Sequence, residues 1–357
     1  MSRLAGFAPP ARALIVAAAV AIVLLFLQAA KSLVAPVLLA VFIAVVAMPP
    51  LRWMQRKGVP KWGALALVVF VLLDVGSILA LIATGALEEF RDSLPTYQER
   101  LTLLNEQLGL WLEGIGIANS KEAVPDILDP ALLAALVPLA LSNMSAVFAT
   151  GLLVLLAVVF ILLEAPGLWL KCRTAFELGE APELRLRRVL DSLNRYMMIK
   201  TGTSLATALL VLAWLWVLGL DFAVLWASLA FLLNFIPYVG AVLMAVPPVL
   251  MALVQTELHT TLLVALGYLF VNTLIGSVLE PRIMGRGLGI SPLAVFLSLL
   301  LWSWVLGTTG AFLSVPLTMV LMVALEASPH TRPISILLGL AVAATERTVD
   351  QEAVLHP

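Results

Sequence analysis

Two interrupted apolar segments carry the polar groups that are best placed to bind a small molecule. Segment 225–254 is broken at NFIPYVG (residues 234–240), and segment 293–325 is broken at GTTG (residues 307–310). The first break offers the amide of Asn234, and the second offers the hydroxyls of Thr308 and Thr309. Lipid cannot hydrogen-bond to backbone groups that an interrupted helix leaves unpaired, so such a break must be buried in protein or line a polar cavity. We therefore expect both breaks to lie along a polar pathway, lined by Asn234, Pro237, Tyr238, Gly240, Asn272, Gly307, Thr308, Thr309 and Gly310.

Each of these residues also has a structural interpretation. The amide of Asn234 could satisfy backbone donors near Pro237 instead of binding a solute. Pro237 and Gly240 are expected to shape the turn, because proline lacks an N–H and glycine adopts backbone angles closed to other residues. The two threonines could serve turn formation alone.

The two breaks are followed by closely similar sequences. Residues 240–247 read GAVLMAVP, and residues 310–316 read GAFLSVP. Pro247 and Pro316 therefore occupy equivalent positions, and we expect them to tilt the second arm of each broken segment.

A few polar residues outside the breaks also merit attention. Asp74 lies midway along the apolar segment 63–86, where a carboxylate costs about 2.5–3.5 kcal/mol on insertion scales. It is a candidate for ion coupling, or a neutral acid hydrogen-bonded to a neighbouring helix. Asn272 and Gly276 would allow close helix packing. Glu280 and Arg282 flank Pro281, and we expect them to form a structural ion pair that fixes the loop.

The composition indicates a polytopic membrane protein. The 357 residues are 62% hydrophobic and 12% charged, whereas soluble domains are about 25% charged. The single cysteine excludes an intramolecular disulfide, and the three histidines do not have metal-ligand spacing. We see no phosphate-binding loop, no basic stripe for nucleic acid and no nucleophile–base pair. No cofactor, no metal site and no enzymatic activity are expected.

About eight apolar segments are long enough to be considered as spans. They are 13–30, 32–51, 63–86, 146–170, 201–220, 225–254, 261–279 and 293–325. Only Lys31 separates the first two, which predicts a tight helical hairpin. The expected fold is an all-α polytopic membrane protein in which two of the segments are broken or re-entrant hairpins.

Charge in the loops predicts the orientation, because Lys and Arg remain on the cytoplasmic side. Residues 52–61 carry four basic side chains and no acidic one, and residues 171–200 carry seven basic side chains against four acidic ones. Segment 87–145, by contrast, carries nine acidic residues against three basic ones. The first two regions are expected inside and the acidic segment outside, with the N-terminus and the C-terminus both cytoplasmic.

The same rule bears on the two broken segments. If 225–254 dips into the membrane and returns, Arg282 and Arg286 fall on the cytoplasmic side, and 293–325 becomes a second dip from the opposite face. Two such hairpins form an inverted repeat, the arrangement associated with alternating access. If both broken segments cross the membrane fully instead, the C-terminus still lies on the cytoplasmic side. Full crossings therefore remain the alternative.

The acidic outside segment contains an amphipathic helix. Its apolar residues recur at steps of three and four, as in Phe90, Leu94, Tyr97, Leu101, Leu104, Leu108 and Trp111. This face either lies on the membrane or on the chain's own spans, or it contacts another subunit.

The motifs resemble those of the AI-2E family, the autoinducer-2 exporter-like transporters, over nearly the whole chain. They are APVLLA (35–40), MPPL (48–51), RKGVPK (56–61), YMMIKT (196–201), NFIPYVG (234–240), EPRIMG (280–285), ISPL (290–293), GTTGA (307–311) and VPL (315–317). The family often has a proline after the glycine of the first break, and this chain has Ala241. The resemblance implies a multi-pass protein of the bacterial inner membrane that forms a homo-oligomer, with a pentamer as one arrangement.

The resemblance also implies transport and leaves the cargo open. The first hypothesis is a secondary transporter that exports a small polar organic solute, such as autoinducer-2 or a related metabolite, with hairpin tips that meet near the midplane. The second is a sodium- or lithium–proton antiporter that uses Asp74, and the third is a non-transporting oligomeric scaffold. The expected organisation is an N-terminal three-span unit (1–86), the acidic helical segment (87–145), the transport unit (146–330) and a cytoplasmic tail (331–357).

Overall fold

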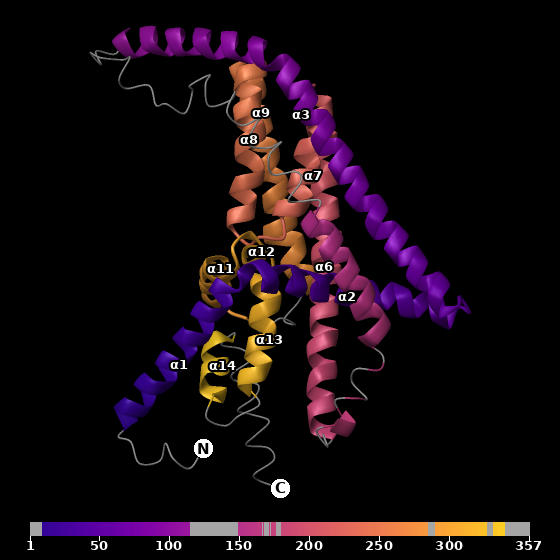
Figure 1. Ribbon diagram of the computed structural model, residues 1–357. Coiled ribbons are helices and arrows are strands. Elements are labelled where there is room, and N and C mark those ends of the chain that lie inside the picture. The colour runs from indigo at the N-terminus through magenta and orange to yellow at the C-terminus, as the bar shows by residue number, and fades with distance from the viewer. Residues whose placement is uncertain are drawn as a thin grey trace. The chain divides into compact units, whose positions relative to one another are not determined.

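The computed structural model describes residues 9–114, 149–165, 167, 171, 173–175, 180–284, 290–326 and 331–339. Within these ranges the chain is helical apart from turns and one isolated β-bridge between Ile290 and Gly339 (Figure 1). It forms two compact units, and each is described by itself. The first contains Met1–Pro49, Leu156–Tyr196 and Arg286–Pro357, and the second contains Pro50–Leu155 and Met197–Gly285.

Four helical stretches are long and apolar enough to cross a membrane, judged by length and composition among the described residues. They are Lys31–Arg56, Lys61–Leu103, Leu186–Val217 and Leu258–Ile283. The other apolar segments are helical as well, but each is shorter than 18 residues within this criterion, among them Leu14–Ala29 and Ala149–Ala165. The prediction of an all-α membrane protein is confirmed.

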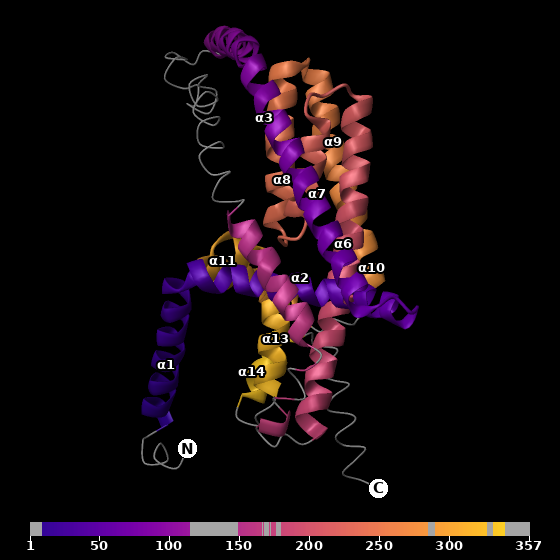
Figure 2. The same ribbon diagram turned by 45° about the vertical axis from the view of Figure 1, so that its right-hand side comes forward.

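The predicted hairpin of the first two helices is wrong. Helix α1 (Pro9–Ala29) and helix α2 (Lys31–Arg56) meet at an angle and do not run back along each other (Figures 1 and 2). Backbone hydrogen bonding is almost continuous through the junction, because Ala30 donates to Phe26 and its carbonyl accepts from Val34. A single linking residue without turn chemistry bends a helix but cannot reverse it.

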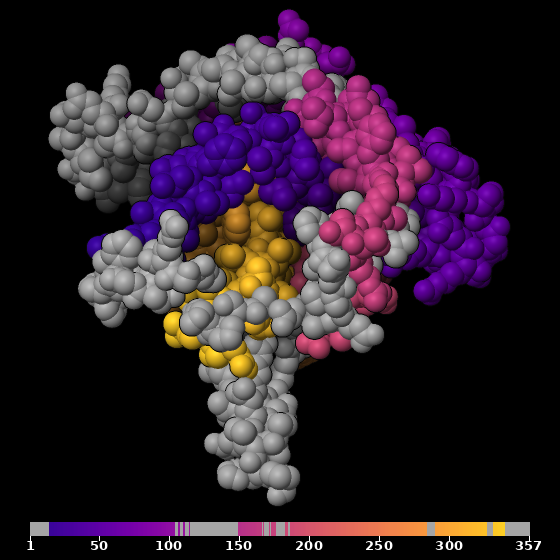
Figure 3. Space-filling model, turned by 60° about the horizontal axis from the view of Figure 1, so that its bottom comes forward, coloured from indigo at the N-terminus to yellow at the C-terminus, as the bar shows by residue number. Residues whose placement is uncertain are grey.

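Within the first unit, α1 packs against α11 (Pro292–Leu306) instead of α2. The Gln28 side chain donates a hydrogen bond to the Trp304 carbonyl at 3.2 Å. Helices α13 (Ser314–Glu326) and α14 (Arg332–Leu338) also pack together, and Figure 3 shows their surface in yellow. This packing places the second broken segment among elements of its own unit.

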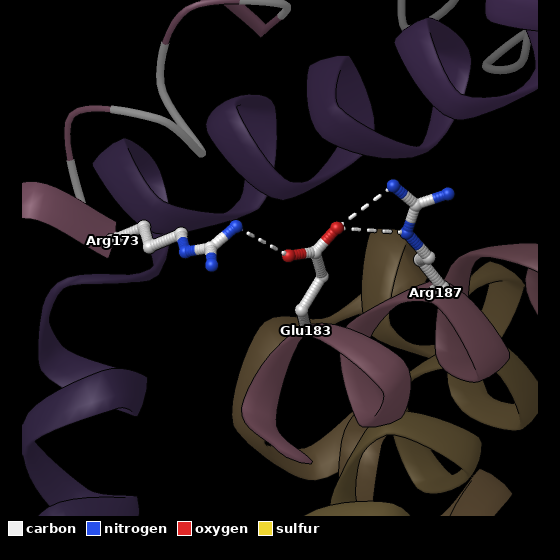
Figure 4. Close-up of polar contacts among 3 residues, drawn as sticks. All are labelled: Arg173, Glu183 and Arg187. Atoms are coloured by element: carbon white, nitrogen blue, oxygen red, sulfur yellow. Dashed lines mark hydrogen bonds and ion pairs between the residues drawn. The ribbon is translucent and has the colours of Figure 1, made fainter. Parts of the chain in front are cut away.

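The basic segment after residue 170 belongs to the same unit and forms surface ion pairs. The Glu183 carboxylate lies between Arg173, at 3.3 Å, and Arg187, at 2.8 Å (Figure 4). Lys171 pairs with Glu164 nearby. Exposed pairs of this kind contribute roughly 0–1 kcal/mol each, so they organise the surface more than they stabilise the fold.

Helix α3 (Lys61–Gly114) joins two elements that the sequence predicts as separate. The apolar segment 63–86 continues without a break into the amphipathic helix, and Pro95 lies inside it. Tyr97 and Leu101 are buried against Met251 and Val254. For these residues the apolar face therefore lies on the chain's own helices, while the side chains of Leu104, Leu108 and Trp111 lie outside the described set.

Polar contacts lock the same part of α3 onto other elements of the second unit. The Tyr97 hydroxyl donates to Asp221 Oδ2 at 2.9 Å, and Arg100 donates to the carbonyl of Gln255. The Gln255 side chain in turn accepts from the Asp221 N–H at 2.9 Å and donates to the Gly219 carbonyl at 3.3 Å. One small network thus ties α3 to the end of the helix that precedes Thr256.

The core of the second unit is formed by α6 (Glu180–Val217), α7 (Ala223–Leu233), α8 (Val239–Gln255) and α9 (Leu258–Asn272). Trp214 of α6 donates to the Leu263 carbonyl at 3.0 Å, and its ring lies where a Cβ on Gly267 would stand. Only a glycine lets the indole approach α9 so closely. This contact fixes how α6 runs beside α9.

The Tyr97–Asp221 hydrogen bond generates a first prediction. Tyr97→Phe is expected to lower the free energy of unfolding in mixed micelles by about 1.5–3 kcal/mol, because it leaves the Asp221 carboxylate without its donor. Thr102→Val is the matched control, since its exposed hydroxyl bonds only within its own helix, to the Gln98 carbonyl. Equal effects of the two substitutions would contradict the proposed role of the network.

Candidate functional site

The first break is a five-residue interruption between α7 and α8, as the sequence predicts. Helix α7 ends at Leu233 and helix α8 begins at Val239. Short turn hydrogen bonds replace the helical ones here, from Ile236 N–H to the Leu233 carbonyl at 2.9 Å and from Phe235 N–H to the Leu232 carbonyl at 3.3 Å. The two helices pack against each other, so the segment forms a helical hairpin.

The turn closes through a strained residue. Tyr238 has φ 59° and ψ −58°, and the Val239 N–H donates across it to the Pro237 carbonyl at 2.6 Å. These angles belong to the rare form of the γ-turn, which is strained for residues with a Cβ. Tyr238 is 53% exposed, so burial of the residue offsets little of this strain. Strain of about 1–3 kcal/mol at one residue is a feature of functional sites.

Gly240 lets the second arm approach the first. A Cβ at this position would stand 2.0 Å from the Leu233 carbonyl oxygen, well inside any real contact. The Gly240 N–H donates to the Ile236 carbonyl at 3.1 Å, so the glycine is also part of the turn. The turn therefore has this geometry only because residue 240 has no side chain.

The Asn234 side chain contacts α6 and does not cap the start of α8. Its amide Nδ2 donates to Ser204 Oγ on α6 at 3.0 Å, and α8 begins without a side-chain cap. Ser204 is fully buried. The amide thus joins the break to the interior face of α6.

That face of α6 is polar, which the sequence analysis missed. Lys200, Thr203, Ser204 and Thr207 are all buried, and their spacing of three and four places them on one side of the helix. The Thr207 hydroxyl has no hydrogen-bond partner in the described part of the chain, nor does the buried hydroxyl of Tyr268 on α9. Buried hydroxyls without partners are costly, so each requires an explanation. The signal was present in the sequence as KTGTS (residues 200–204), a polar run at the start of an apolar span.

The end of this polar face carries a buried ion pair. Lys200 Nζ lies 2.8 Å from Glu280 Oε1 and 2.9 Å from Oε2, with side chains 8% and 15% exposed. The predicted ion pair of Glu280 is therefore present, but its partner is Lys200 and not Arg282, which is exposed. Glu280 begins the short helix α10 (Glu280–Met284), which includes Pro281, so the pair fixes α10 to α6.

A π-helix delivers Glu280 to this position. The chain winds as a π-helix, η3, over Thr273–Leu279, directly between α9 and α10. Asn272 precedes η3, and its Oδ1 lies 3.4 Å from where a Cβ on Gly276 would stand. π-Helical turns are rare and are often found at functional sites.

The second break differs in detail from the predicted one. Only Gly307 is non-helical within the predicted stretch, at φ 66° and ψ −144°, and the short helix α12 (Thr308–Phe312) follows at once. The chain breaks again at Leu313, and α13 then begins at Ser314. Pro316 cannot donate a hydrogen bond to the Phe312 carbonyl, which accounts for the second interruption.

The second hairpin uses the same close approach as the first. A Cβ on Gly310 would stand 1.8 Å from the Trp302 carbonyl oxygen, as one on Gly240 would stand 2.0 Å from that of Leu233. Helices α12 and α13 both pack on α11, and Trp302 Nε1 donates to Thr318 Oγ1 on α13 at 3.0 Å. The repeated glycine in the sequence therefore has the same physical reason in both segments.

The remaining predicted residues are placed as follows. The hydroxyls of Thr308, which is exposed, and of Thr309 form no hydrogen bond within the described residues. Asp74 is exposed on α3 and likewise has no partner there. Pro247 lies inside α8, which continues through it. The described residues contain no group of three or more His, Cys, Asp or Glu that could hold a metal ion.

The sequence is similar to those of known transport proteins over most of its length. The AI-2E family transporter profile matches residues 14–330. The AI-2 transport protein TqsA of Escherichia coli (strain K12) is 37% identical over 318 residues, which cover 89% of this chain and 92% of TqsA. A Haemophilus influenzae relative, named as a candidate transport protein, is 36% identical over 92% of this chain and 96% of its own length. Escherichia coli YhhT, named in the same way, is 35% identical over 90% of this chain and 92% of its own length. The chain is a multi-pass membrane protein, and it belongs to the AI-2E family of transporters.

Proposed function

We propose that the protein is a secondary transporter that exports a small polar organic solute, such as autoinducer-2 or a related metabolite, across the bacterial inner membrane. The observation that carries this proposal is the pair of broken hairpins built on the same glycine-to-carbonyl approach. TqsA, which is named for AI-2 transport, supports the choice of solute. The polar face of α6 beside Asn234 supplies the hydroxyl and amide groups that an oxygen-rich solute requires.

The lengths of the helical arms support re-entrant hairpins. At 1.5 Å per residue, the 11 residues of α7 span about 16 Å, and the 13 residues of α13 about 20 Å. The hydrocarbon core of a membrane is about 30 Å thick. Arms of this length reach membrane depth and end there, where the broken backbone requires polar surroundings. Such hairpins, entering from opposite faces, would expose the pathway alternately to either side.

We also propose that the protein acts as a homo-oligomer. Asp74 is exposed on an apolar stretch of α3, where lipid would face a carboxylate if the chain stood alone. A second copy of the chain that covers this face removes the charge from lipid.

A sodium- or lithium–proton antiporter is the second candidate function. It is favoured by the same exposed carboxylate of Asp74, which has no partner within the described residues and is able to bind a cation. The scaffold hypothesis is weaker, because Tyr97 and Leu101 of the outside helix are already buried on the chain's own helices.

The close approach at the two glycines predicts loss of transport. Gly240→Ala and Gly310→Ala are each expected to reduce autoinducer-2 flux in vesicles at least about tenfold, because overpacking of about 1–3 kcal/mol shifts the hairpin turn. Membrane insertion is expected to be unchanged. Gly202→Ala is the matched control, since a Cβ there meets nothing within 4 Å. Normal flux in both hairpin variants would remove the breaks from the mechanism.

The strained turn predicts that relieving its strain makes the protein more stable and less active in transport. Tyr238→Gly is expected to raise the free energy of unfolding by about 1 kcal/mol, because glycine adopts positive φ without steric cost. Flux is expected to fall, since a relaxed turn holds the hairpin less firmly in one geometry. A thermal-unfolding measurement beside the flux assay tests both parts, and a variant less stable than the native protein would show that the turn is not strained.

The position of Asp74 predicts contact between copies. In a protein whose single cysteine, Cys172, is replaced by serine, Asp74→Cys is expected to form cross-linked dimers in membranes. Leu81→Cys, on the same helix and 70% exposed, tests whether the contact is specific. Monomeric Asp74→Cys under oxidising conditions would argue against a covering subunit. Dye-monitored pH changes on adding sodium, compared between the native protein and Asp74→Asn, test the antiporter alternative.

A further inference from the structure

Lys200 is the only charged residue that is buried among the described residues. Its ammonium group has three N–H donors, and two of them are directed to the two oxygens of Glu280. The third donor has no partner in the described part of the chain. A buried ammonium with an unused donor is able to bind a further hydrogen-bond acceptor.

Stability alone does not explain why this pair is buried. Removing two charges from water costs several kcal/mol per ion, and an apolar pair of similar volume is often as stable or more stable. The pair also depends on the π-helix η3, a rare conformation that must be maintained. A buried charge that is costly to maintain, at the end of a polar helix face, indicates a role in binding a ligand.

The groups next to Lys200 are suited to an oxygen-rich ligand. Along the same face of α6 follow the hydroxyls of Thr203 and Ser204, the latter bonded to the Asn234 amide, and then the unpartnered hydroxyl of Thr207. The face from Lys200 to Thr207 is about 10 Å long, at 1.5 Å per residue. It carries one cation and several neutral groups that donate and accept hydrogen bonds. Among the described residues, no acid apart from Glu280 contacts the cation.

We propose that Lys200 is the binding residue for a small, oxygen-rich anionic solute, and that Glu280 is the resident counterion which the solute displaces. This inference rests on the proposed transport function and names the chemical class of the solute. The anion accepts hydrogen bonds from Lys200, and its remaining oxygens reach the hydroxyls of the α6 face. Charge-assisted hydrogen bonds of this kind are stronger than neutral ones.

In this proposal Glu280 moves away from Lys200 when the solute binds. It is the more exposed partner, at 15% against 8% for Lys200, and it lies at the start of a short helix. If η3 returns to an α-helix, the residues after it rotate by about 100° for each residue of register change. In the proposal that rotation moves the carboxylate away from Lys200, and the solute takes its place on the ammonium group.

The test uses the purified full-length protein and pairs of solutes in which a carboxylate replaces a CH2OH group, namely glycerate against glycerol and lactate against 1,2-propanediol. Thermal stabilisation as a function of solute concentration gives the affinity of each. The native protein is expected to prefer the anion of each pair. Lys200→Met is expected to lower the anion affinity at least about tenfold, and Lys200→Arg to retain most of it.

Glu280→Gln separates a binding role from a structural one. Without the competing carboxylate, Lys200 is expected to bind the anion about tenfold more tightly or better, whereas a purely structural pair would lose stability with no change in anion preference. Lys31→Met, at an exposed lysine at the start of α2, controls for general charge effects. If Lys200→Met does not fold, the double variant Lys200→Met/Glu280→Gln leaves no buried charge unpaired and serves in its place.

The outcomes separate the inference from the proposed function. Anion preference that survives in Lys200→Met, or its absence in the native protein, overturns the inference. Normal autoinducer-2 flux in Lys200→Met overturns it too and leaves the transport proposal intact. A native protein that binds anions through Lys200 but moves no autoinducer-2 in vesicles supports the site and contradicts the proposed cargo.

Discussion

The structure depends on one constraint: backbone N–H and C=O groups in lipid must be hydrogen-bonded, and an interrupted helix leaves some of them unpaired. At residue 234 and again at residues 307 and 313 the chain breaks inside apolar segments that are otherwise helical. The turns at these points satisfy much of the backbone locally, through short hydrogen bonds such as the one from Ile236 to Leu233. Glycine at the start of each second arm then lets the arms close upon each other.

How far the sequence predicts this arrangement differs from one element to another. The breaks, their repeated glycines and the helical character of every described apolar segment follow from local rules, because proline, glycine and hydrophobic length act within a few residues. The angle between α1 and α2 does not follow from local rules. In the sequence, a charged residue between two apolar runs resembles a turn, but in the structure the backbone hydrogen bonds continue almost unbroken through it. The extent of the second break was also wrong, since Thr308–Phe312 forms a helical turn that no local signal announces.

The partner of Glu280 shows why sites are harder to predict than breaks. Arg282 is adjacent in sequence and was the natural choice, but the two residues are only two apart on a helix, where side chains do not face each other. Lys200 lies 80 residues away, and only the packing of α6 beside α9, fixed by Trp214 on Gly267, brings it near. A sequence read without spatial contacts gives no means to pair them. The π-helix that orients Glu280 toward Lys200 likewise cannot be predicted from the residue types alone.

These features fit together as a division of roles within the second unit. The hairpin of α7 and α8 is held by backbone geometry, with a strained tyrosine and an obligatory glycine, so it has few alternative conformations. The α6 face and Glu280 are held by polar contacts, which a solute of similar chemistry is able to replace one by one. The proposed transport uses both properties, because in it a rigid hairpin moves as a body while its polar contacts are exchanged. The rigid part is the one that the sequence reveals, since steric rules are local. The exchangeable part appears only in the fold, and the proposed specificity for the solute rests on it.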